Sequence, residues 1–76
     1  MNKVRREQIS TVVGKLKDCK DVLEEIKNDE DCSRENMPEN LENSQRYTDS
    51  EEASDSLDDA TSDIGNAIDT LEKITG

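Results

Sequence analysis

The residues best suited to hold a ligand lie near the middle of the chain. Arg46 and Tyr47 are adjacent there, and Tyr47 is the only aromatic residue in the sequence. A guanidinium group pairs with phosphate or carboxylate, and an aromatic ring stacks on flat or cationic groups. We predict a site for a nucleotide-like anion formed by Arg46 and Tyr47, with Asn40 and the basic Arg5 as supporting contacts. The alternative is a purely structural loop in which Tyr47 and Leu41 pack on the rest of the fold.

The side chains of common catalytic sites are missing from this sequence. It has no histidine, and glycine occurs only at positions 14, 65 and 76, so no glycine-rich phosphate loop can form. No serine or cysteine stands beside a plausible base. We therefore predict a protein that is not an enzyme and uses no cofactor.

The acidic residues do not have the spacing of a metal site. They lack the loop pattern and the glycine of a calcium-binding EF-hand, and they fall largely on the outer face of a predicted helix. A solvated acidic surface is the expected state of the main cluster, which contains Asp55, Asp58, Asp59 and Asp63.

Length and composition allow a single small domain spanning residues 1–76. Only 29% of the residues are apolar and 39% are charged, and the net charge is −10. This composition is close to that of disordered proteins, so the pattern of the apolar residues must supply the fold. Chains this short usually need disulfides, metal or partner subunits for stability, and here partner subunits are the expected solution.

The two cysteines indicate a reducing compartment. Cys19 and Cys32 are thirteen residues apart on one predicted helix, so about 20 Å separates them and they cannot form a disulfide. We expect the cytoplasm of a bacterial host cell, with Cys19 as a small core residue. No apolar run reaches the roughly 20 residues that a membrane span needs, so no membrane association is expected.

The first half of the chain has a heptad pattern. Its apolar residues are spaced 3, 4, 3, 4 and 3 apart, which predicts one stripe along a helix over residues 3–33, flanked by Val13 and Val22. The stripe consists of Ile9, Val12, Leu16, Cys19, Leu23 and Ile26.

The second half repeats this pattern after a joint at residues 34–48. Pro38 cannot continue a helix, and Thr48 and Glu51 have the spacing of a capping box, which predicts a helix over residues 49–75. Ile68 widens the apolar stripe of this helix on one side. The stripe consists of Ala53, Leu57, Ala60, Ile64, Ala67, Leu71 and Ile74.

Two such helices joined by a short connector predict an all-α antiparallel helical hairpin. One hairpin buries little surface, so a four-helix bundle or a higher homo-oligomer is expected. Residues 1–20 carry six bases and two acids, whereas residues 21–59 carry three bases and fifteen acids. A second hairpin packed head to tail would bring basic and acidic ends together, which predicts an isologous dimer.

The acidic surface is a further candidate for binding. A long negative face can imitate the phosphates of DNA and occupy the groove of a DNA-binding protein. Ordinary solubility is the alternative explanation for this charge. The basic group of Lys3, Arg5 and Arg6 is too small to bind nucleic acid alone, so no direct nucleic-acid binding is expected.

The sequence resembles a group of short, acidic, helical-hairpin proteins encoded by phages and mobile elements of Gram-positive bacteria. The resemblance extends from Val4 to Ile74 and is most distinctive at Asn36-Met37-Pro38-Glu39-Asn40-Leu41 followed by Ser44, Arg46 and Tyr47. It continues in Glu-Glu-Ala, Leu-Asp-Asp-Ala and Ala-Ile-Asp-x-Leu-Glu of the second half. The resemblance implies a phage setting, where small binding proteins block a host defence protein or trap its nucleotide signal between subunits.

We therefore expect a homo-oligomeric, non-catalytic phage or mobile-element protein that counters host defence by binding. Its partners are expected to be itself and either a host defence protein or a nucleotide-like molecule. The alternatives are an acidic DNA mimic that inhibits a DNA-binding host protein and a plain coiled-coil adaptor. An adaptor would tolerate changes at the joint and lose function on Leu16→Asp or Ile64→Asp.

Overall fold

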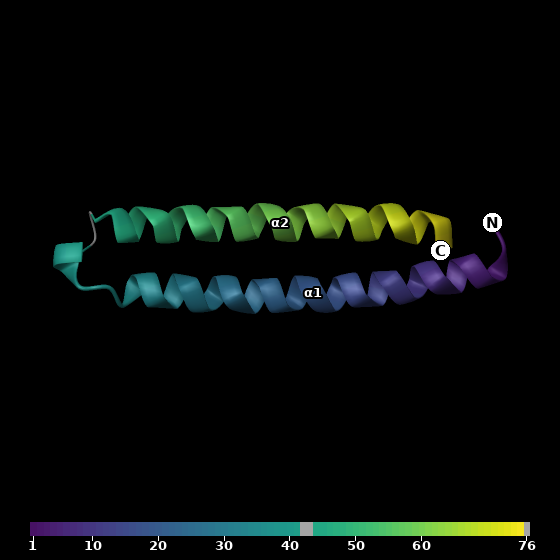
Figure 1. Ribbon diagram of the computed structural model, residues 1–76, viewed down its shortest axis with the longest axis horizontal. Coiled ribbons are helices and arrows are strands. Elements are labelled where there is room, and N and C mark those ends of the chain that lie inside the picture. Colours follow the sequence, from purple (N-terminus) through teal and green to yellow (C-terminus); the bar gives the residue numbers. More distant parts are fainter. Residues whose placement is uncertain (42–43, 76) are drawn as a thin grey trace.

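The protein is a hairpin of two long antiparallel helices, as the sequence predicts (Figure 1). The computed structural model describes residues 1–41 and 44–75. It contains helix α1 (Lys3–Glu35), a short 3-10 helix η1 (Glu39–Leu41) and helix α2 (Gln45–Thr75). The hairpin measures 59 × 14 × 13 Å, and both chain ends lie at the end opposite η1.

Helix α1 begins and ends with asparagine caps. The Asn2 side chain accepts a hydrogen bond of 2.8 Å from the backbone N–H of Arg5. At the other end, the backbone N–H and the side-chain amide of Asn36 both donate to the carbonyl of Cys32, at 3.1 and 3.0 Å. The helix ends before Met37, as expected from Pro38, but it runs two residues beyond the predicted end at 33.

Helix α2 starts earlier than predicted, at Gln45 instead of residue 49. The hydroxyl of Ser44 accepts a hydrogen bond of 3.3 Å from the backbone N–H of Tyr47, and Thr48 donates its hydroxyl to the Ser44 carbonyl at 3.4 Å. Ser44 is therefore the helix cap, and the predicted capping box at Thr48 is wrong. A serine cap supplies the same acceptor as threonine, and the polar residues after it are compatible with a helix although they show no apolar period.

Six aliphatic residues form the seam between the helices at seven-residue intervals. Leu16 and Ile64 are typical of them, since each is half-buried against the opposite helix. The positions between them are mixed: Val13 and Ile68 are each 6% exposed, but Lys20, Lys27 and Thr61 also face the seam. The six are Ile9, Leu16 and Leu23 of α1 and Leu57, Ile64 and Leu71 of α2.

The predicted stripes were only half correct. Val12 is 47% exposed whereas its neighbour Val13 is buried, and Cys19 is exposed and not a core residue. In α2, Ile68 is buried, but Ala53 and Ala67 are exposed and Ile74 is 42% exposed. The reason is geometric. Each leucine or isoleucine of the seam has a 3–4 spacing both with the position three before it and with the position four before it. These two positions lie on opposite sides of the seam. The prediction paired Leu16 with Val12, four before it, whereas the structure pairs it with Val13, three before it.

The core of this hairpin is thin. Among the described residues no large side chain is completely buried, and Val13 and Ile68 are the only buried apolar residues. In the part of the chain that the structure describes, no helix has both the length and the hydropathy needed to cross a lipid bilayer. The helices therefore depend on a narrow line of contacts along their full length.

The assignment of Val13 to the seam can be tested against Val4, which is 62% exposed on the same helix. Val13→Ala removes two buried methyl groups, so we expect the free energy of unfolding to fall by about 1 to 2 kcal/mol. Val4→Ala gives the same change in helix propensity and should cost less than about 0.5 kcal/mol. Urea unfolding followed by circular dichroism measures both, and equal losses would contradict the assignment.

Candidate functional site

A cleft of about 570 Å³ opens at the joint, between the end of α1, η1 and the start of α2. The exposed Arg46 and the acidic Glu30 and Asp49 are among the residues that line it. The cleft therefore combines one exposed cation with acidic and apolar walls. Its remaining lining residues are Ser33, Arg34, Asn36, Met37, Pro38, Leu41 and Ser50.

The four residues predicted to bind a ligand do not gather in one place. Arg46 lines the joint cleft, but Tyr47 and Asn40 are not among its lining residues. Tyr47 is half-buried, and it points away from Arg46 because successive residues of a helix point about 100° apart. Arg5 is exposed near the start of α1, close to the opposite end of the 59 Å hairpin. Within one chain, Arg46 alone of these four faces the cleft.

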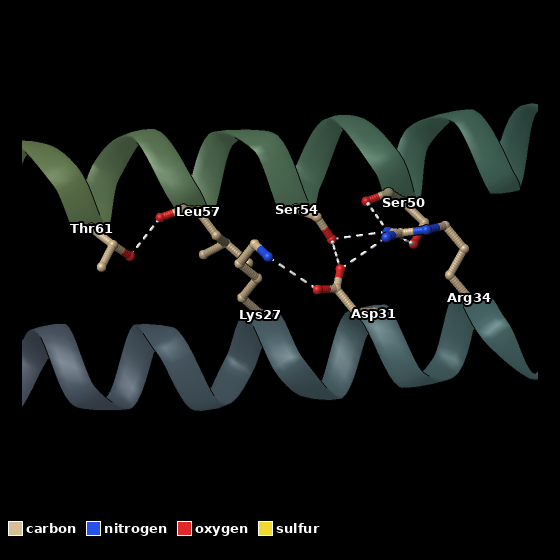
Figure 2. Close-up of polar contacts among 7 residues, drawn as sticks. All are labelled: Lys27, Asp31, Arg34, Ser50, Ser54, Leu57 and Thr61. Atoms are coloured by element: carbon tan, nitrogen blue, oxygen red, sulfur yellow. Dashed lines mark hydrogen bonds and ion pairs between the residues drawn. The ribbon is translucent and has the colours of Figure 1, made fainter.

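Sequence reasoning missed a cluster of polar side chains that joins the two helices beside the cleft (Figure 2). One guanidinium nitrogen of Arg34 donates to the Ser54 hydroxyl at 2.9 Å, and to the carbonyl and hydroxyl of Ser50 at 3.2 and 3.3 Å. The other donates to Asp31 at 2.9 Å. The Ser54 hydroxyl donates to Asp31 at 2.6 Å, and Lys27 donates to the second oxygen of Asp31 at 3.1 Å.

Asp31 is the electrostatic centre of this polar cluster. The hydrogen bond from Ser54, followed by that from Lys27, stabilises the charged carboxylate and lowers its pKa from 3.8 to about 2, while partial burial opposes the shift. The hydrogen bond to Asp31 in turn raises the pKa of Lys27. Among the described residues, no buried side-chain nitrogen or oxygen lacks a hydrogen-bond partner.

The polar cluster favours the observed alignment of the helices. A shift of α2 by one heptad would put Leu57 in the place of Ser50 and Thr61 in the place of Ser54, so Arg34 would lose the hydroxyl that Ser50 offers. Polar groups in a helical seam are known to fix register in this way. The available sequence signal was that Ser50, Ser54, Leu57 and Thr61 share the 4–3–4 spacing of the seam.

The sides of the hairpin that flank the seam differ in chemistry. On one side, Lys17 of α1 forms an ion pair of 3.1 Å with Glu72 of α2. Residues at seven-residue intervals from Lys17 and from Glu72 therefore lie on this side. Exposed carboxylates from both helices occupy these positions and the ones next to them. We call this the acidic side: Asp21, Glu24, Glu51, Asp55, Asp58, Asp69 and Glu72.

The opposite side of the seam is apolar. Its members are exposed or half-buried, and a shallow hollow beside Cys19 and Val22 is lined almost entirely by carbon and sulfur atoms. The joint cleft opens on the same side, since Ser33 and Arg46 lie in register with these residues at seven-residue intervals. We call this the apolar side: Val12, Cys19, Val22, Ile26, Ala53, Ala60, Ala67 and Ile74.

Comparison with known protein families, with curated proteins and with solved structures found no match to this chain.

The role of Ser54 in the polar cluster can be tested by titration. Ser54→Ala removes the hydrogen bond that most lowers the pKa of Asp31, so we expect that pKa to rise from about 2 toward 3.8. Because the pKa of Asp31 is lowered in the hairpin, its carboxylate stabilises the fold above pH 3.8, and this contribution is lost as the pH falls toward 2. Carbon-13 NMR of the Asp31 carboxyl group measures the shift directly.

The matched control is Ser56→Ala, which makes the same change at an exposed position of the same helix. It should leave the Asp31 pKa unchanged. A normal Asp31 pKa in the unmodified protein would contradict the proposed geometry of the cluster.

Proposed function

We propose that this chain is a non-catalytic binding protein of a phage or mobile element that counters a host defence by binding a basic host protein. The observation that carries the proposal is the separation of the acidic side from the apolar side. Next to the seam, seven carboxylates gather on the acidic side, whereas the corresponding positions on the other side are mostly apolar. The phage setting rests on the sequence resemblance described above.

The charge density of the hairpin supports this proposal. The described residues between 21 and 59 carry three bases and fourteen acids, a balance of −11, and they lie in a rod only 14 × 13 Å across. A narrow negative rod complements the positively charged groove of a DNA-binding protein. The binding mode favoured here is therefore imitation of the DNA backbone, with carboxylates taking the place of phosphates.

Neutralising part of the acidic side tests this proposal. The triple variant Glu51→Gln, Asp55→Asn, Asp58→Asn removes three charges there. In affinity purification from a bacterial lysate, we expect the unmodified protein to retain a basic DNA-binding protein that the variant loses. The complex should dissociate as NaCl is raised from about 0.1 to 0.5 M, because salt screens exposed charges.

The matched control removes three charges from the outer faces of the helices by Glu25→Gln, Glu52→Gln and Asp59→Asn. These positions are exposed but lie away from the acidic side. This control should retain the host protein. If the two triple variants behave alike, or if binding does not respond to salt, host-protein binding through the acidic side is wrong.

The joint cleft favours a second candidate function, the sequestration of a nucleotide signal. Arg46 provides a cation for a phosphate group, and Met37, Pro38 and Leu41 provide an apolar wall for a base. Glu30 and Asp49 would repel the same phosphate, so this candidate requires additional positive charge near the cleft.

The second candidate is tested with Arg46→Ala. We expect native mass spectrometry to show ATP or a cyclic dinucleotide bound to the unmodified protein and absent from this variant. The control variant Arg6→Ala removes an arginine that is exposed near the start of α1, far from the joint cleft, and should retain the ligand. Equal retention by both variants, or none by the unmodified protein, would count against nucleotide binding.

A further inference from the structure

The apolar side has no partner within the hairpin. Val12, Val22 and Ile26 of α1 are 47%, 52% and 47% exposed, and Ile74 of α2 is 42% exposed. Together with Ile9, Leu16 and Leu23 in the seam, they give α1 an apolar arc wider than one neighbouring helix can cover. Helices with this arc pack against two neighbours, as in a four-helix bundle.

We propose that a second copy of this chain packs on the apolar side, head to tail, and that it completes the joint cleft with its own Arg5. The dimensions fit a stable dimer. The hairpin measures 59 × 14 × 13 Å, so a long face covered from end to end has an area of at most roughly 800 Å², which is about the area that each partner buries in a specific interface. Covering it would also supply the buried apolar surface that a single hairpin lacks.

The orientation follows from the charges. The open half of the hairpin, residues 1–20 and 60–75, carries seven bases and five acids, a balance of +2. The joint half carries the balance of −11 given above. A parallel arrangement would place the two strongly acidic halves together, whereas a head-to-tail arrangement places each acidic half beside an open half. This self-complementary charge favours a second copy over an unrelated amphipathic helix.

The head-to-tail arrangement changes the composition of the joint cleft. Arg5 precedes Val12 by one heptad, and Arg46 precedes Ala53 by one heptad, so both arginines are in register with the apolar side. They lie near opposite ends of one hairpin. Full overlap of two copies therefore brings Arg5 of the partner subunit to the cleft that holds Arg46, Glu30 and Asp49.

The partner's Arg5 supplies the positive charge that nucleotide binding in this cleft requires. It can pair with Glu30 or Asp49 when no anion is bound. This role of the partner's Arg5 rests on the second candidate function, nucleotide binding, whereas the dimer itself does not depend on any ligand.

The dimer is tested by a matched pair of neighbouring substitutions. Val12→Asp places a charge on the apolar side, whereas Thr11→Asp places the same charge on the outer face of α1, and the two original side chains have nearly the same shape. Analytical ultracentrifugation at 20 to 100 μM should give the unmodified protein and Thr11→Asp twice the 8.6 kDa mass of one chain. Val12→Asp should be monomeric.

A folded monomer of the unmodified protein at these concentrations would overturn the proposal, as would a dimer of Val12→Asp. An unrelated protein that copurifies with a monomeric hairpin through the apolar side would also overturn it. Neither substitution alters the acidic side, so a failed dimer test leaves host-protein binding standing.

Cross-linking tests the head-to-tail orientation of the two copies in a background that changes the apolar side only at Cys19. In a Cys19→Ala, Cys32→Ser background, the single substitutions Arg5→Cys and Arg46→Cys are made in separate chains. A short bismaleimide should cross-link an equal mixture of the two chains and neither chain alone. Cross-linking of either chain with itself indicates a parallel arrangement, and no cross-link in the mixture indicates that the ends do not meet; both results overturn the head-to-tail dimer.

Discussion

The hairpin depends on a narrow apolar seam, in which six leucine and isoleucine side chains line the half of α1 and α2 that lies away from the joint. Each helix contributes three of them at seven-residue intervals. Val13 and Ile68, which are buried between them, complete the apolar contact, and the other intervening seam positions include lysine, serine and threonine. Such a narrow contact holds two long helices side by side but leaves the molecule with little buried volume.

The thin seam explains why the ends of the hairpin need polar interactions. Near the joint, the leucine and isoleucine line gives way to Asp31, Arg34, Ser50 and Ser54, which exchange hydrogen bonds instead. These groups remain partly accessible to water, so their value is more in fixing the alignment than in adding stability. In this alignment, Lys17 and Glu72 meet on the acidic side, and the apolar residues next to the seam on the other side of both helices form one face.

Much of the fold was predictable from the sequence, because heptad spacing and Pro38 are local signals. The start of α2 could not be predicted in this way, because Ser44 and Thr48 offer equivalent caps and only one of them can be used. The choice between Val12 and Val13 was also undetermined, because both keep the spacing of the seam. In the joint, Arg46 lines the cleft, and its role in binding stays a prediction; Arg34 was missed because its partners, Ser50 and Ser54, are sixteen and twenty residues away.

The sequence by itself determined that this chain forms two long helices with a break at Pro38, because helix periodicity and the missing proline N–H act within a few residues. Only the tertiary structure decided which side of each helix faces the other. That choice is made by contacts between distant segments: Val13 and Ile68 are buried against the opposite helix, and Asp31 and Arg34 exchange hydrogen bonds with Ser50 and Ser54. With these faces turned inward, Val12, Cys19 and Ile26 are exposed, and Arg46 lines the joint cleft.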